Sequence, residues 1–176
     1  MFEHWGEFYL MAGSAAAVLI GLIFVVVSLL QDRSRSSVLT GSQLYMGPIV
    51  IMVSFALVLS ASALTPSMDA KHFAMIAGVI AIWGIVRAVI SLIGIGRLEG
   101  EHKAHWTDPW FYAILPLALY FALGLVAGGL WHGSDWAPLG VAGTIVAMLL
   151  LAIRNEWDLI TWIAPRPADG DPDLGD

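Results

Sequence analysis

The sequence predicts an all-α integral membrane protein, a bundle of five transmembrane helices. Hydrophobic residues make up 59% of the 176 residues and charged residues only 12%, whereas soluble domains contain about 45–50% and 25%. Five apolar stretches are each long enough to cross a hydrocarbon core of about 30 Å, which takes roughly 20 helical residues. Most charged residues lie between and beyond these stretches. This composition excludes an ordinary water-soluble fold.

Helix-end signals bound most of these stretches. The second opens at Gly47-Pro48 and closes at Thr65-Pro66, positions where proline suits a helix end. In the fourth, Asp108 precedes Pro109, the order of an N-cap and a first helical residue. The helical pattern of the fifth continues to Pro165, although residues 154–163 can also be read as a separate surface helix. We expect spans over about residues 8–30, 45–64, 73–96, 109–130 and 136–163.

Basic residues predict the orientation. Because consecutive spans alternate in direction, the segments that follow spans one, three and five share one side of the membrane. That side carries nearly all of the Lys and Arg outside the spans, and the opposite side carries only Lys71. The positive-inside rule therefore predicts an outside N-terminus and a cytoplasmic C-terminus. We expect residues 1–165 to form a single transmembrane domain and residues 166–176 to form a flexible acidic tail in the cytoplasm.

The inventory of reactive residues predicts that the protein is not an enzyme. The chain contains no cysteine, which excludes disulfides, thiolate zinc sites and a cysteine nucleophile. It also contains no hydrolase, phosphate-binding or dinucleotide-binding motif. The acidic and histidine residues around His102 and His105 match no metal-binding spacing. We expect no catalytic residue, metal or cofactor, and the net charge of −6 gives no reason to expect nucleic acid binding.

Small residues predict where helices pack. Lipid tails are as apolar as leucine, so membrane helices associate through close backbone approach and scarce polar contacts. The series in the third span predicts a left-handed seam along one face of that helix. Pro116 removes the backbone bond to Tyr112 and predicts a kink in the fourth span. The expected packing residues are Gly13, Ala17 and Gly21 in span one, Ala77, Ala81, Gly84 and Ala88 in span three, and Gly124 and Gly128 in span four.

Arg87 is the charged residue that lies deepest in a predicted span. It precedes Arg97 by ten residues, about 15 Å along a helix, which is too far for its side chain to reach the membrane surface comfortably. A guanidinium at this depth needs a partner. One interpretation is a static tie to the end of span five, and the other is a pore or ligand site. The candidate partners are Ser91, the ring of Trp83, and the carboxylates of Glu156 and Asp158.

Both ends of the chain resemble a known group of proteins. Residues 12–17 read AGSAAA, residues 21–28 read GLIFVVVS, and residues 153–159 read IRNEWDL. These segments are similar to a family of small multi-pass proteins of the bacterial inner membrane, some of which are described as modulators of the membrane protease FtsH. The resemblance implies a bacterial inner membrane and implies no site or activity.

Three functions fit this sequence. The first is a non-enzymatic accessory or scaffold subunit that packs against other membrane subunits, because the chain has extensive small-residue faces and no catalytic set. The second is a homo-oligomeric channel in which Arg87 favours anions. The third is a subunit that holds a lipid or pigment in grooves beside the kinked fourth span. The expected partners are the lipid bilayer and either further copies of the chain or other membrane subunits.

Overall fold

A computed structural model describes residues 4–29, 47–96 and 109–163, and within these ranges the chain is an antiparallel bundle of helices without strands. Each of the five expected spans is a helix long and apolar enough to cross a membrane, which confirms the predicted fold class. The π-helical turn η3 runs directly into α5, so these two elements form one span. The helices are α1 (Gly6–Leu29), α3 (Gly47–Leu64), α4 (Ala70–Gly96), η3 (Trp110–Ile114), α5 (Leu115–Trp131) and α6 (Ala137–Ile163).

The observed helix ends differ slightly from the expected ones, for local reasons. α4 begins at Ala70 and not at residue 73, because the carboxylate of Asp69 accepts a hydrogen bond from the His72 backbone N–H (2.7 Å) and caps the first turn. α6 runs unbroken to Ile163, so residues 154–163 extend the fifth span. Residue 30 and residues 45–46, at the ends of two expected spans, lie outside the described residues.

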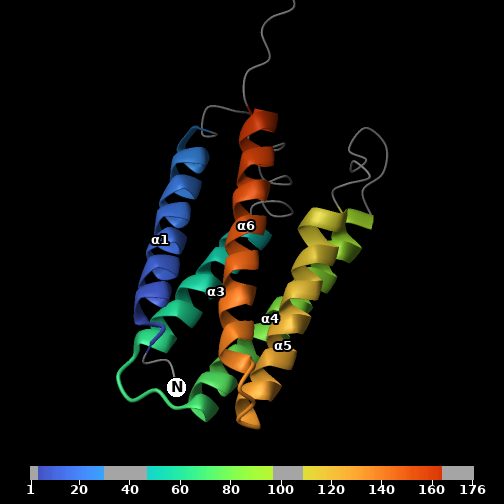
Figure 1. The fold of residues 1–176 in the computed structure, drawn as a ribbon. Helices are drawn as coiled ribbons and strands as arrows, with labels where there is room; N and C mark the ends of the chain where they lie inside the picture. The colour runs from blue at the N-terminus through green and yellow to red at the C-terminus, as the bar shows by residue number, and fades with distance from the viewer. Residues whose placement is uncertain (1–3, 30–46, 97–108, 164–176) are drawn as a thin grey trace, which may run out of the picture.

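The bundle consists of two helix pairs joined by α6. α1 packs on α3, α4 packs on α5 in the most extensive contact of the bundle, and α6 contacts α1, α3 and α5 (Figure 1). We call the end where α6 terminates the C-terminal end of the bundle; α1 and α4 also run towards this end (Figure 1). The core between the pairs holds large buried side chains such as Phe73, Leu123, Ile145 and Met148.

Close packing of α4 on α5 follows from the small residues of α4. Ala77, Ala81, Gly84 and Ala88 are all buried, and the ring of Tyr120 lies directly on Gly84, where a Cβ atom would overlap it. This arrangement is the close backbone approach that membrane helices use in place of hydrophobic burial. Large apolar side chains instead cover much of the outside of the bundle, for example Val79 and Ile82 on α4 and Leu125 on α5.

Candidate functional site

A cluster of polar side chains lies at the C-terminal end of the bundle, between α6 and η3. The side-chain amide of Asn155 donates through Nδ2 to the backbone oxygen of Phe111 (3.0 Å). The hydroxyl of Tyr112 donates to Oδ2 of Asp158 (3.1 Å) and lies 3.4 Å from the backbone oxygen of Asn155. We call Arg154, Asn155 and Asp158, together with Phe111 and Tyr112, the α6–η3 polar cluster.

Arg154 supplies the positive charge of this cluster. Its Nη1 lies 3.2 Å from Oδ1 of Asn155 and 3.8 Å from Oδ2 of Asp158, and its guanidinium stacks 3.3 Å from the centroid of the Phe111 ring. The guanidinium plane suits both an ion pair and an aromatic face. Arg154 is therefore engaged by three neighbours, and the cluster balances one cation with one carboxylate.

The π-helical turn explains why Asn155 is needed. The backbone N–H of Leu115 donates to the oxygen of Trp110, five residues earlier. In the same register the next donor would be residue 116, and Pro116 has no N–H to give to the oxygen of Phe111. Asn155 supplies the missing donor from the neighbouring helix. A π-turn therefore occupies the place where the sequence predicted a proline kink, and no charge or motif marked Asn155 as a functional residue.

Glu156 stands apart from this cluster, although it is the next residue along α6. Its side chain is only 7% exposed, and its Oε1 atom is buried without a hydrogen-bond partner among the described residues. A carboxyl group removed from water without a donor is costly, which is why polar groups inside a membrane mark functional sites so often. Glu156 is consequently the most unusual polar side chain among the described residues.

The structure records no ion pair between Arg87 and the end of α6 within the described residues. The partner of Asp158 is Arg154, and Glu156 has no ion-pair partner within the part of the chain that the structure describes. Arg87 is half-buried, and its Nη2 atom lies 3.6 Å from the point where a Cβ of Gly47 would stand, beside the first residue of α3.

The other two candidate partners of Arg87 are not paired with it either. Trp83 is 61% exposed on the outside of α4, and the described cation–π contacts involve Lys71 and Arg154 instead. Ser91 is buried on α4, and its Oγ has no hydrogen-bond partner among the described residues. Arg87 therefore lies near a helix N-terminus and outside the α6–η3 polar cluster.

The predicted packing residues fall into two groups. Inside the bundle, Gly13 packs on the Cβ of Ser60, and Gly124 lies on Ala81, in addition to the α4 residues that receive α5. Outside it, Ala17, Gly21 and Gly128 are exposed, and a Cβ at either glycine would meet nothing within 4 Å. Close packing within the chain thus uses only part of the small-residue pattern.

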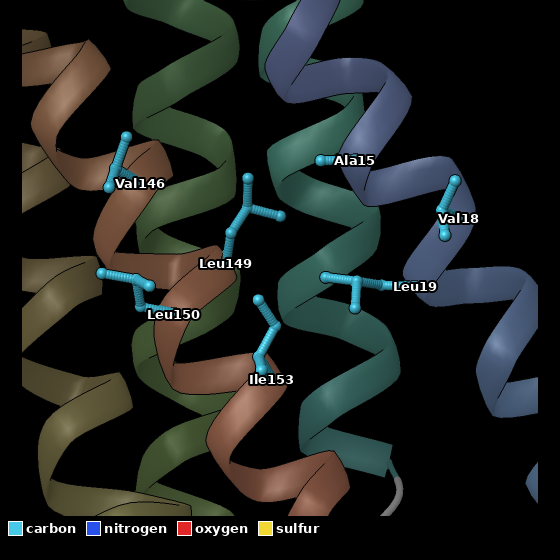
Figure 2. A pocket seen from close by; sticks show the side chains of 7 residues that line it. All are labelled: Ala15, Val18, Leu19, Val146, Leu149, Leu150 and Ile153. Atoms are coloured by element: carbon cyan, nitrogen blue, oxygen red, sulfur yellow. The ribbon is translucent and has the colours of Figure 1, made fainter.

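An apolar groove lies between α1 and α6 (Figure 2). Its volume is about 410 Å³, and Leu19 and Leu149 are its most buried lining residues. The sequence predicted such a groove beside the fourth span, whereas the described groove is lined only by α1 and α6. We call it the α1–α6 groove; its lining residues are Ala15, Val18, Leu19, Val146, Leu149, Leu150 and Ile153.

The remaining titratable groups form no metal-binding cluster within residues 4–29, 47–96 and 109–163. Asp69 and His72 make an exposed contact between the spans α3 and α4, with Nδ1 and Oδ1 2.8 Å apart. Hydrogen bonds from the backbone and then from the side chain of His72 lower the pKa of Asp69. His102, His105 and the acidic tail of residues 166–176 lie outside the described residues.

Comparisons of the chain with protein families, with curated proteins and with solved structures found no match. Arguments about function therefore rest on the residues and their geometry.

Proposed function

We propose that the chain is a non-enzymatic accessory subunit of a membrane complex that binds its partner through one face of α1. The observation that carries this proposal is a row of exposed residues at alternating spacings of four and three along that helix. Leu10, which is 62% exposed, begins the row and Phe24, which is 70% exposed, is its largest side chain. We call this row the outer α1 face; its members are Leu10, Ser14, Ala17, Gly21, Phe24 and Ser28.

The chemistry of this face suits another transmembrane helix. The spacing is that of a left-handed coiled-coil seam, and four of its six positions are serine, alanine or glycine, which allow two backbones to approach closely. The two hydroxyl groups already donate to their own helix, from Ser14 to the oxygen of Leu10 (2.7 Å) and from Ser28 to that of Phe24 (2.9 Å). No polar group on the face then needs a partner, so packing alone can stabilise the contact.

The α4–α5 contact shows the same principle inside the chain. There the small residues of α4 receive α5, with Tyr120 seated on Gly84. On α1 an equivalent set of small residues faces outwards, and no described helix covers it. The exposed small residues of α1 could receive a further helix in the same way as the small residues of α4 receive α5.

The location and orientation belong to the same proposal. The resemblance at the two ends of the chain favours a bacterial inner membrane, and the distribution of Lys and Arg favours an outside N-terminus with a cytoplasmic C-terminus. A reporter enzyme fused to the C-terminus that is active only in the cytoplasm tests the orientation. Activity of a reporter that works only outside the membrane contradicts it.

The experiment is a native mass determination of the complex extracted in a mild detergent, with every co-purifying protein identified. We expect a defined assembly that Gly21→Leu dissociates, because the larger side chain separates the two backbones. Ala118→Leu, an exposed position on α5, is the matched control and should leave the assembly intact. A stable, stand-alone monomer from native membranes contradicts the proposal.

Arg87 supports a second function, a homo-oligomeric pore that prefers anions. The side chain is half-buried beside Gly47, and within the described residues it has no ion-pair partner. A guanidinium held in this way can attract an anion into a pore formed by several copies. The test is anion flux into liposomes that contain the purified oligomer. Flux that Arg87→Gln abolishes while the oligomer persists supports the pore, and absence of flux in the original protein contradicts it.

A further inference from the structure

Glu156 and the α1–α6 groove lie on the same face of α6. Leu149 and Ile153 line the groove, and Glu156 follows them by seven and three residues, the spacing that places side chains one above another on a helix. The next turn beyond the groove, towards the C-terminal end of the bundle, therefore carries a buried carboxyl group, one oxygen of which has no partner in the part of the chain that the structure describes. The α1–α6 groove and the Glu156 carboxyl group thus follow one another along a single face of α6.

The length of this face matches one leaflet of a bilayer. Val146, the first lining residue on α6, precedes Glu156 by ten residues, which is about 15 Å along a helix. Half of a hydrocarbon core of about 30 Å has the same length. A lipid of the leaflet on the C-terminal side would lay an acyl chain along the groove and bring its head group to the level of Glu156.

The size of the groove also fits an acyl chain. Its volume of about 410 Å³ equals roughly fourteen times the ~30 Å³ that one water molecule occupies in the liquid, which is enough for the methylenes of one chain. The groove extends along α6 from Val146 to Ile153, which is about 10 Å of helix. A helix about 10 Å across and of that length has roughly twice the volume of the groove, so the groove is too small for a helix. Figure 2 shows Leu149 and Ile153 on α6 and Leu19 on α1 projecting into the space between the two helices. The lining is entirely apolar, so the groove itself offers nothing to a polar ligand.

Charge complementarity identifies the head group. The carboxyl oxygen of Glu156 needs a hydrogen-bond donor, and the neighbouring cation Arg154 is engaged by Asn155, Asp158 and the Phe111 ring. A primary ammonium supplies both a positive charge and N–H donors, and a charge-assisted hydrogen bond of this kind is stronger than a neutral one. We infer that the α1–α6 groove and Glu156 together form a binding site for one phosphatidylethanolamine molecule, with an acyl chain in the groove and its ammonium group on the carboxylate.

The test is lipid retention by the intact protein. The protein is exchanged into an equimolar mixture of phosphatidylethanolamine, phosphatidylcholine and phosphatidylglycerol, and the retained lipid is identified by native mass spectrometry. We expect enrichment of phosphatidylethanolamine over both others, because phosphatidylcholine has no ammonium N–H and phosphatidylglycerol has no cation. Glu156→Gln should lower this enrichment by about tenfold, which corresponds to about 1.4 kcal/mol. Glu7→Gln, which makes the same change at an exposed carboxylate in the first turn of α1, should not.

A second pair of variants tests the groove independently of the carboxyl group. Ala15→Trp fills the groove from α1 and should abolish retention of phosphatidylethanolamine, whereas Ala118→Trp on α5 should preserve it. Equal retention of the three lipids, preference for phosphatidylglycerol, or unchanged selectivity in Glu156→Gln would each overturn the inference. So would a partner protein that cross-links to the groove. The groove and the outer α1 face are on different sides of α1. A result that refutes the lipid site therefore leaves the proposed subunit role untouched, and a result that refutes the subunit role leaves the lipid site untouched.

Discussion

Replacing Asn155 with alanine tests whether the α6–η3 polar cluster stabilises the π-turn. The substitution removes the Nδ2 donor that lies 3.0 Å from the oxygen of Phe111, and Pro116 cannot replace it. An unsatisfied buried polar group costs about 1–3 kcal/mol, whereas side-chain hydrogen bonds in membrane proteins average about 0.6 kcal/mol with a maximum near 1.7. Because the Phe111 oxygen is left without this donor, we expect a loss near the upper membrane value, about 1–2 kcal/mol.

The decisive assay is a double-mutant cycle with Pro116→Ala, measured as reversible unfolding in bicelles. Alanine at residue 116 restores an N–H that can serve the helix backbone, so Asn155→Ala should cost much less in that background. We expect a coupling free energy of about 1 kcal/mol between the two residues, within the usual range for groups that share a partner. An equal cost of Asn155→Ala in both backgrounds would refute the reasoning, because the amide would then act through some other contact.

Further predictions concern packing, charge and pH. Gly84→Leu should destabilise the bundle by at least the ~1–3 kcal/mol typical of overpacking, since a Cβ there overlaps the Tyr120 ring; Gly128→Leu, in open space, should leave the unfolding free energy nearly unchanged. Because the pKa of Asp69 is lowered by His72, the stability that this cap contributes should be fully present above the ordinary carboxyl pKa and lost as pH falls through the lowered value. Thermal unfolding at a series of pH values checks this, and Asp69→Asn should flatten that part of the profile.

The fold could be predicted because its determinant is local and composition-based. Each span is an uninterrupted apolar segment of helix-forming residues, and in lipid a helix satisfies its own backbone without help from the rest of the chain. Helix ends were harder to place, because the cap at Asp69 depends on the geometry of one side chain with one N–H. The packing face of α4 was also readable, since a regular series of small residues has few other uses in a membrane. The series did not indicate that α5 is the helix that packs there.

The polar site was less predictable, because it depends on which helices become neighbours. One of the two interpretations of Arg87 tied it to the end of α6 from depth alone, and depth does not determine which helix face a side chain occupies. Arg154 lies four residues before Asp158 on the same helix, a pairing that local spacing favours over any distant one. Asn155 carried no charge and no motif, so its role became visible only with the unsatisfied carbonyl before Pro116.

The different uses of small residues on α1 and α4 link packing to function. The α4 series covers the inward face, and Tyr120 fills the space that Gly84 leaves. Of the three packing residues predicted on α1, only Gly13 packs inwards, against Ser60, while Ala17 and Gly21 face outwards. If exposed small residues reflected composition alone, replacing Gly21 with leucine would remain harmless in native membranes, since lipid accepts leucine readily. A loss of assembly without a loss of bundle stability in Gly21→Leu would therefore distinguish a surface that binds a helix from one that only faces lipid.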